Sequence, residues 1–340
     1  MITSGTATQQ KTPPSFLITI DTEGDNLWDQ TSLDITSNNA AALPRFQNLC
    51  ESYGYHPTYL VNYEMALSPA FVRFGKDILK RSTGEIGMHL HAWNSPPIDP
   101  LTNDDFFYKP YLIEFPEDVL KKKIRFLTGL LEQTFGVKML SHRAGRWAFN
   151  EIYAKALRDE GYQIDCSVTP FVSWESSLGD PEGCGGVDYR RFPKKAYFMD
   201  LEDISKPGSS SLLELPMTIL SVQPQLLQRT HRMIEGFPVV RKLIDKVCPP
   251  AIWLRPDGSN LKAMLGVVRH ATRNQYQYIQ FMLHSSEFMA GGSPRFRSDD
   301  DIERLYRHIE ALFSMIHKSG YAGRTLSEHF YEFHQTRTVV

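Results

Sequence analysis

The sequence has few cysteines and no C-x-x-C pair. Its 340 residues contain Cys50, Cys166, Cys184 and Cys248, which stand far apart along the chain. This spacing indicates neither a disulfide framework nor a zinc site built on thiolates. We therefore expect reduced thiols and a cytoplasmic location.

Long hydrophobic runs are also missing. No stretch approaches the ~20 consecutive apolar residues that a membrane-spanning helix needs. The segment 1–15 has no basic start followed by an apolar run, which a secretion signal would have. We expect a protein without a membrane span, with a flexible tail over residues 1–14.

Neither sign of charge is in excess. Lys and Arg number 37 against 39 Asp and Glu, so the formal net charge is -2. This balance argues against a nucleic-acid partner, which would select a basic surface. With 41% hydrophobic residues the chain can build a substantial core, and we expect one domain over 15–340. The oligomeric state cannot be read from the sequence.

Strand and helix patterns alternate along the chain. Strand patterns lie at 16–20, 56–62, 85–91, 139–145, 162–168, 212–218 and 278–286, and helix patterns at 40–53, 71–82, 117–135, 150–160 and 300–320. Because parallel strands are joined by crossovers of helical length, the alternation predicts an α/β fold with a parallel sheet of about seven strands. Two segments, near 94–116 and 170–211, lack periodicity and are rich in Pro, Gly and aromatics, so we expect long loops that cover a site.

Polar residues follow most of these strands at their carboxyl ends. They are Asp21, Glu23 and Asp25, His89 and His91, His142, Arg143 and Arg146, Asp165, and His284. The carboxyl ends of parallel strands lie at one face of the sheet, where such folds place their active sites. We therefore expect these side chains to converge.

His89 and His91 could bind one cation together. In an extended segment, side chains two residues apart point the same way, and Asp21 and Glu23 have the same spacing. Each pair alone has an ordinary interpretation, as structural histidines or a solvated acidic loop. Together they form a nitrogen and oxygen ligand set that suits zinc, with nickel or cobalt as alternatives, and leaves a position for water.

The remaining candidates each have a structural and a functional interpretation. Arg143 is either a surface residue or a fork that orients a carboxylate. Arg146 and Trp147 could bind a sugar, the indole offering a flat face. Asp165 could simply cap a turn. His284 is either a core histidine or a general acid.

These residues resemble a known family. The ordered segments FLITIDTEGD, HPTYLVN, GEIGMHLH, SHRAGRW, GYQIDCSV, LLELPMT and MLHSSEF are similar to the polysaccharide deacetylases of carbohydrate esterase family four, which contain the NodB homology domain. The resemblance spans roughly residues 16–290 and is greatest to variant members from polysaccharide and O-antigen biosynthesis. It implies a distorted seven-stranded (β/α) barrel and metal-assisted removal of N-acetyl or O-acetyl groups from sugars.

The resemblance also implies roles for single residues. Asp21 matches the catalytic base, and Arg143 matches the residue that orients this base. Glu23 matches the metal-binding acid, with Asp25 in reserve, and His89 matches the first metal histidine. His284 matches the catalytic histidine, and Asp165 matches the acid that tunes it. Thr22 separates two acids that are adjacent in most members. Trp93 occupies the place of the second metal histidine, so His91 must substitute for it, and we place Trp93 with the sugar-binding residues.

The expected reaction is metal-dependent hydrolysis of an acetylated sugar. The missing export signal favours a nucleotide-linked or lipid-linked precursor over a finished polymer. Two alternatives remain open from the sequence. One is a metal-dependent amide hydrolase with a non-acetyl substrate, and the other is a catalytically inactive, sugar-binding member of the family.

Overall fold

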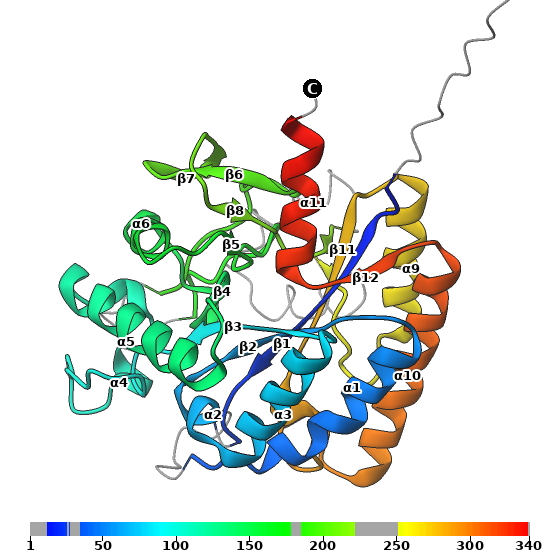
Figure 1. Ribbon diagram of the computed structural model, residues 1–340, viewed down its shortest axis with the longest axis horizontal. Coiled ribbons are helices and arrows are strands. Elements are labelled where there is room, and N and C mark those ends of the chain that lie inside the picture. Colours follow the sequence, from blue (N-terminus) through cyan, green and yellow to red (C-terminus); the bar gives the residue numbers. More distant parts are fainter. Residues whose placement is uncertain (1–11, 26, 28–34, 178–184, 222–250, 339–340) are drawn as a thin grey trace, which may run out of the picture.

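Seven parallel strands form the centre of the fold. The computed structural model describes residues 12–25, 27, 35–177, 185–221 and 251–338. In this part of the chain the parallel strands are hydrogen-bonded in the order β11-β1-β2-β3-β4-β5-β8 (Figure 1). Their bounds are β1 (Ser15–Thr22), β2 (Thr58–Val61), β3 (Glu85–Leu90), β4 (Ser141–Ala144), β5 (Ile164–Asp165), β8 (Leu213–Glu214) and β11 (Tyr278–His284). The predicted α/β fold, a curled parallel sheet of the (β/α) type, is confirmed.

Helices cover the outer side of this sheet (Figure 1). They are α1 (Leu43–Ser52), α2 (Tyr63–Leu67), α3 (Pro69–Arg81), α5 (Glu117–Phe135), α6 (Glu151–Asp159), α9 (Leu261–Arg273) and α10 (Asp299–Lys318). Each long helix has an apolar stripe that packs on the strands, and local residues set the ends. The Ser298 hydroxyl caps α10 by accepting from the Asp301 amide, and Gly136 ends α5 at φ +71°.

The two faces of the strands bury different side chains. In β1, Phe16, Ile18 and Ile20 belong to the large core between sheet and helices. Leu17, Thr19 and Asp21 are also buried, but on the inner face of the curled sheet. Because side chains alternate along a strand, this phase decides which polar residues reach the interior.

The long loop expected at 170–211 contains structure that the sequence did not predict. Strands β6 (Tyr197–Asp200) and β7 (Asp203–Pro207) form an antiparallel hairpin, and β6 extends the sheet by pairing with β8. Residues 178–184 of that segment, and 1–11 of the expected flexible tail, lie outside the described residues. The segment 94–116 is a loop as expected, with two short turns of helix, α4 (Asp105–Tyr108) and η2 (Leu112–Glu114).

Three further strands and two further helices were not predicted. They are β9 (Ile219–Leu220), β10 (Ile252–Trp253), β12 (Ala322–Arg324), which pairs with β1, the last helix α11 (Leu326–Thr338), and, in the loop noted above, α4. Helix α9 likewise had no predicted counterpart. Within the described residues, no helix is long and apolar enough to cross a bilayer. Cys50 and Cys166 are buried free thiols, whereas Cys184 and Cys248 lie outside the described residues.

Helix α11 carries a buried histidine that should make the fold acid-sensitive. The ring of His329 is 5% exposed and its Nδ1 lies 2.8 Å from the Ser15 hydroxyl. Burial, with the Arg324 charge, lowers its pKa to about 4. The unfolded chain therefore takes up this proton first, so the stability is complete above about pH 6.5 and is lost as the pH falls towards 4.

We expect this loss to reach about 3 kcal/mol, since each pKa unit corresponds to about 1.4 kcal/mol. The measurement is denaturant unfolding from pH 7 to pH 4 of the wild type and of His329→Gln, with the exposed His270→Gln as control. The free energies of unfolding of His329→Gln and of the wild type should converge at low pH. Parallel stability curves for the two proteins would contradict this expectation.

Candidate active site

Strand register brings the predicted site residues together. Asp21 at the end of β1 lies directly opposite His284 at the end of β11, and His89 on β3 lies opposite Arg143 on β4. All four are on the inner face of the sheet, since the residues on either side of each in its strand pack into the outer core or against the helices. The predicted convergence of these strand ends is therefore observed.

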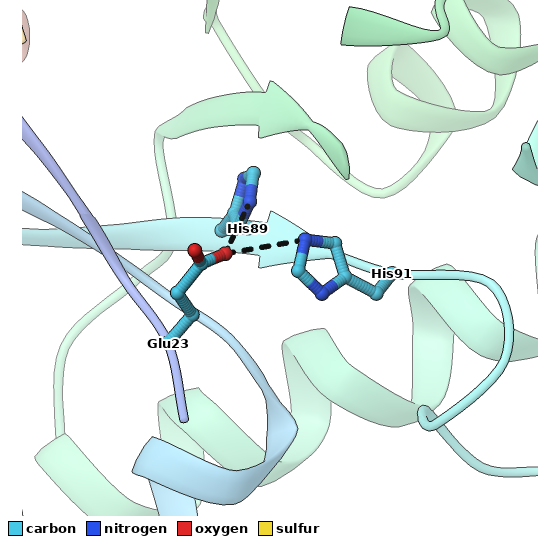
Figure 2. A group of neighbouring side chains, drawn as sticks. All are labelled: Glu23, His89 and His91. Atoms are coloured by element: carbon cyan, nitrogen blue, oxygen red, sulfur yellow. Dashed lines mark ion pairs between the residues drawn. The ribbon is translucent and has the colours of Figure 1, made fainter. Parts of the chain in front are cut away.

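Glu23, His89 and His91 form a compact group of potential metal ligands. Glu23 Oε2 lies 3.5 Å from His89 Nε2 and 3.4 Å from His91 Nε2 (Figure 2). All three side chains are buried, and their ligand atoms lie within 4.8 Å of one another. Figure 2 shows the carboxylate and the two rings turned towards a common point.

This geometry fits a small divalent cation. A tetrahedral zinc ion with bonds of about 2.0 to 2.1 Å holds its ligands about 3.4 Å apart. The His89 Nδ1 lies 3.0 Å from the carbonyl oxygen of Arg143, so it is the ring nitrogen that donates. The Nε2 lone pair of His89 then faces the group, the orientation that a metal ligand needs. Burial lowers the pKa of His91 well below its usual value, which favours the neutral ligand form. Burial would also lower the pKa of His89, but the charges of Asp21 and Glu23 outweigh this effect and raise it instead.

Asp21 is held by a buried arginine. Arg143 Nη1 donates to Asp21 Oδ1 at 2.5 Å, and both side chains are almost completely inaccessible. Arg143 is itself fixed, donating from Nη2 to the Thr19 hydroxyl at 2.8 Å and from Nε to the Cys166 carbonyl at 3.2 Å. Burial alone would raise the pKa of Asp21, but the charges of Arg143, His89 and His284 lower it. Asp21 is therefore an oriented carboxylate beside Glu23, His89 and His91, the potential metal ligands that we call the cation group.

His284 faces the same point from β11. Its Nε2 lies 3.9 Å from Asp21 Oδ2 and 3.8 Å from Glu23 Oε1. Its Nδ1 lies 3.0 Å from Glu287 Oε2, which also accepts from the His284 amide at 2.9 Å. Glu287 is fully buried in η4 (Ser285–Phe288). Burial would raise its pKa, but Arg255 and His284 lower it to about 2.

Glu287 and Arg255 were not identified from the sequence. Arg255 Nη2 lies 3.3 Å from both carboxylate oxygens of Glu287 and 3.0 Å from His284 Nδ1, so it contacts both the acid and the imidazole ring. The spacing of His284 and Glu287 in HSSEF, three residues within one turn of helix, was the available signal. Nothing in the sequence pattern pointed to Arg255, which follows a segment outside the described residues.

The predicted pairing of Asp165 with His284 is wrong. Asp165 Oδ1 lies 2.7 Å from His142 Nδ1, and its carboxylate accepts from the amide and hydroxyl of Ser167. His142 Nε2 in turn lies 2.9 Å from the Tyr153 hydroxyl of α6. Since Ile164 and Cys166 occupy the inner face of β5, Asp165 lies on the outer face, where it cannot reach His284. Its contacts are those of a structural residue.

Asp25 does not join the cation group either. Its carboxylate accepts from the Thr36 hydroxyl, from the Asn38 and Asn39 amides, and from the Asn39 side chain. These bonds begin the short helix η1 (Asn38–Ala42). The main chain of Glu23 is fixed instead by Ser285, whose hydroxyl both accepts from the Glu23 amide at 3.0 Å and donates to its carbonyl at 3.1 Å. Asp25 thus shapes the loop that carries Glu23.

The three predicted sugar-binding residues lie near the cation group in different settings. Trp93 stacks on His91, with ring centroids 4.6 Å apart, and Arg146 lies over Trp93 at 5.2 Å. Trp147 is 8% exposed, and its ring packs over Arg143 at 4.9 Å. The expectation that Trp147 offers an open face to a sugar is therefore corrected, because the indole covers the buried Arg143 instead.

Gly145 of the RAGRW segment permits the approach of β4 to His91. A Cβ at this position would lie 2.3 Å from His91 Cδ2 and 2.6 Å from the Leu90 carbonyl oxygen. We expect Gly145→Ala to displace the His91 ring and to weaken zinc affinity at least tenfold. Metal titration measures this, with Gly129→Ala as the control because a Cβ there meets nothing within 4 Å. Unchanged zinc affinity in Gly145→Ala would show that His91 is not a ligand.

Comparisons with known proteins identify the fold. No protein-family model matches the sequence, and no curated protein matches it. Among solved structures, a protein assigned as a polysaccharide deacetylase from Mycobacterium smegmatis is 15% identical, with a TM-score of 0.51, over 99% of this chain and 96% of that one. The chain shares the fold of a polysaccharide deacetylase. A 4-alpha-glucanotransferase from Thermococcus litoralis, 12% identical, has the same TM-score over 94% of this chain and 40% of that one.

The fold alone does not select between these two chemistries. At the strand ends of this chain, a group of potential metal ligands, an oriented carboxylate and a histidine meet at one place. An arrangement of this kind can activate water against a carbonyl carbon. The choice of reaction therefore depends on the side chains and not on the architecture.

Proposed function

We propose that this protein is a metal-dependent deacetylase that hydrolyses N-acetyl or O-acetyl groups of a sugar. The observation that carries the proposal is that Asp21 and His284, whose Oδ2 and Nε2 atoms lie 3.9 Å apart, meet next to the group formed by Glu23, His89 and His91. The deacetylase named among the solved structures supports the same chemistry on this fold. The proposed setting is polysaccharide or O-antigen biosynthesis, with a nucleotide-linked or lipid-linked acetylated sugar as substrate.

Each proposed role follows from a contact. Glu23, His89 and His91 would hold the cation, which when bound supplies Lewis-acid polarisation of water and of the acetyl carbonyl. Asp21, fixed by Arg143, accepts the proton of the attacking water. His284 Nε2 delivers a proton to the departing sugar nitrogen or oxygen, so that acetate and the free amine or alcohol are formed. Glu287 orients His284 through Nδ1.

The proposal is tested by metal analysis and acetate release. Purified wild-type protein should contain close to one equivalent of zinc, nickel or cobalt, and His89→Ala should contain almost none. His270→Ala, on the exposed face of α9, is the matched control and should retain the metal. Acetamido sugars and their O-acetyl counterparts should release acetate only with the metal present.

The two alternatives give different results in the same assay. Metal without acetate release, but with release of another acyl group, would indicate a non-acetyl amide hydrolase. Absence of metal from the wild type, with sugar binding retained, would indicate an inactive binding protein. Either result would contradict the proposed deacetylase.

Glu287 should act on the reaction through His284. We expect Glu287→Gln to lower kcat by about 10- to 100-fold, since the amide no longer fixes the ring as the carboxylate does. Nitrogen NMR of the His284 ring should show a changed tautomer in this variant, which a purely structural role would not produce. Asp165→Asn should instead lower the free energy of unfolding and leave the His284 ring signals unchanged. A normal kcat in Glu287→Gln, or a shifted His284 signal in Asp165→Asn, would contradict this assignment.

A further inference from the structure

Arg146 lies beside the cation group, and no acidic side chain in the described part of the chain forms an ion pair with it. It follows β4 in the short helix η3 (Gly145–Trp147), three residues after Arg143, and it is only partly exposed. Among the described residues, no carboxylate forms an ion pair with it, whereas Arg143 pairs with Asp21. A cation taken partly out of water is costly unless an anion compensates it. Among the described residues, the charge of Arg146 therefore has no acidic side chain to compensate it, whereas the charge of Arg143 is compensated by Asp21.

The guanidinium of Arg146 is held in place by aromatic residues. Its Cζ lies 5.2 Å from the centre of the Trp93 ring and 5.3 Å from that of Phe106. Ring faces orient a guanidinium but satisfy none of its N–H groups, of which there are five. Within the part of the chain that the structure describes, these donors can therefore still bind a ligand.

The backbone that carries Arg146 is strained. Arg146 and Trp147 have φ values of +53° and +61°, a left-handed conformation that non-glycine residues rarely adopt. Such conformations are unfavourable for non-glycine residues and persist where the surrounding structure enforces them. Here the reversal turns Arg146 towards Trp93 and Trp147 towards Arg143. The conformation thus places a cation at the edge of the site.

Arg146 and the cation group lie on the same side of the sheet. Trp93, over which Arg146 lies, stacks directly on His91 at 4.6 Å and 19°. The charge of Arg146 also acts on His91 and on Glu23. A molecule whose acetyl group reaches Glu23, His89 and His91 would therefore have another part near Arg146.

We propose that Arg146 binds an anionic group of the substrate, so that the preferred substrate is an acetylated sugar that carries a carboxylate or a phosphate. This inference rests on the proposed deacetylase function and names its substrate class. A guanidinium fork pairs with either anion through two parallel hydrogen bonds, so both belong to the same recognition chemistry. Arg146 is a specificity residue in this assignment.

The test compares three sugars that differ in one substituent. They are N-acetylglucosamine, its 1-phosphate and the corresponding N-acetylated uronic acid. The wild type should have a kcat/KM at least tenfold higher for one charged sugar than for the neutral one, and that sugar identifies the anion. Arg146→Gln should reduce this ratio to near one, and Arg146→Lys should give an intermediate ratio. The exposed Arg269→Gln on α9 should leave it unchanged.

A binding measurement separates this inference from the proposed function. Inorganic phosphate and acetate are titrated calorimetrically into the purified wild type, Arg146→Gln and Arg269→Gln. At least tenfold weaker binding of one anion by Arg146→Gln alone supports the anion site, even if no sugar is hydrolysed and the deacetylase proposal fails. Equal anion affinities in all three proteins, or an equal loss of kcat/KM on charged and neutral sugars, would overturn the inference.

Discussion

Asp21→Asn should lower the hydrolysis rate by about 10²- to 10⁴-fold, the usual contribution of a positioned general base. The amide keeps the shape of the carboxylate and can still accept a hydrogen bond from Arg143, but it cannot take a proton from water. Glu23, His89 and His91, the proposed cation ligands, are unchanged, so the variant should retain its metal. Loss of turnover with retained metal is the expected result, measured by acetate release and metal content together.

A matched control separates this effect from a general loss of charge. Asp159→Asn changes an exposed aspartate on α6 and should keep the wild-type rate. If Asp21→Asn hydrolysed the substrate within threefold of the wild-type rate, Asp21 would not be the base. If it lost its metal as well, Asp21 would belong to the ligand set instead.

The sequence correctly predicted that Glu23, His89 and His91 gather in one place, because the topology of a parallel sheet determines this. Parallel strands place their carboxyl ends at one face, so polar residues that follow successive strands must gather there. Glu23, His89 and His91 were expected to form one group on this argument, and their ligand atoms lie within 4.8 Å. The two-residue spacing of His89 and His91 was sufficient to predict that both rings lie on the same side, because side chains alternate along an extended strand.

The errors concern which face of a strand a residue occupies. Asp165 and Asp21 both end a strand, but Asp21 is on the inner face whereas Asp165 faces α6 and His142. Strand β5 is a short segment of continuous burial, so its sequence shows no alternation from which the phase could be determined. Contacts made by distant loop residues, such as those of Asp25 with Asn39, leave no periodic pattern at all.

Arg143 should prove indispensable to both folding and activity. Its side chain is fully buried, and removal of one partner of a buried ion pair leaves the other charge uncompensated, at a cost of about 3 to 5 kcal/mol. We expect Arg143→Met to lower the free energy of unfolding by this amount, because Asp21 then remains as a buried carboxylate without its counter-ion. The same change should abolish turnover, since nothing then orients Asp21 towards the attacking water.

The double variant Asp21→Asn, Arg143→Met distinguishes these two effects. Removing both charges leaves no uncompensated charge in the interior. The loss of unfolding free energy in the double variant should therefore be smaller than the sum of the two single losses by about 0.5 to 3 kcal/mol, as measured by denaturant unfolding. Its turnover should stay as low as that of Asp21→Asn, because the base is still missing. Strictly additive stability losses would show that the pair at 2.5 Å is not coupled in the folded protein. Recovered turnover would mean that neither residue handles the proton, and the reaction would then have to depend on His284 alone.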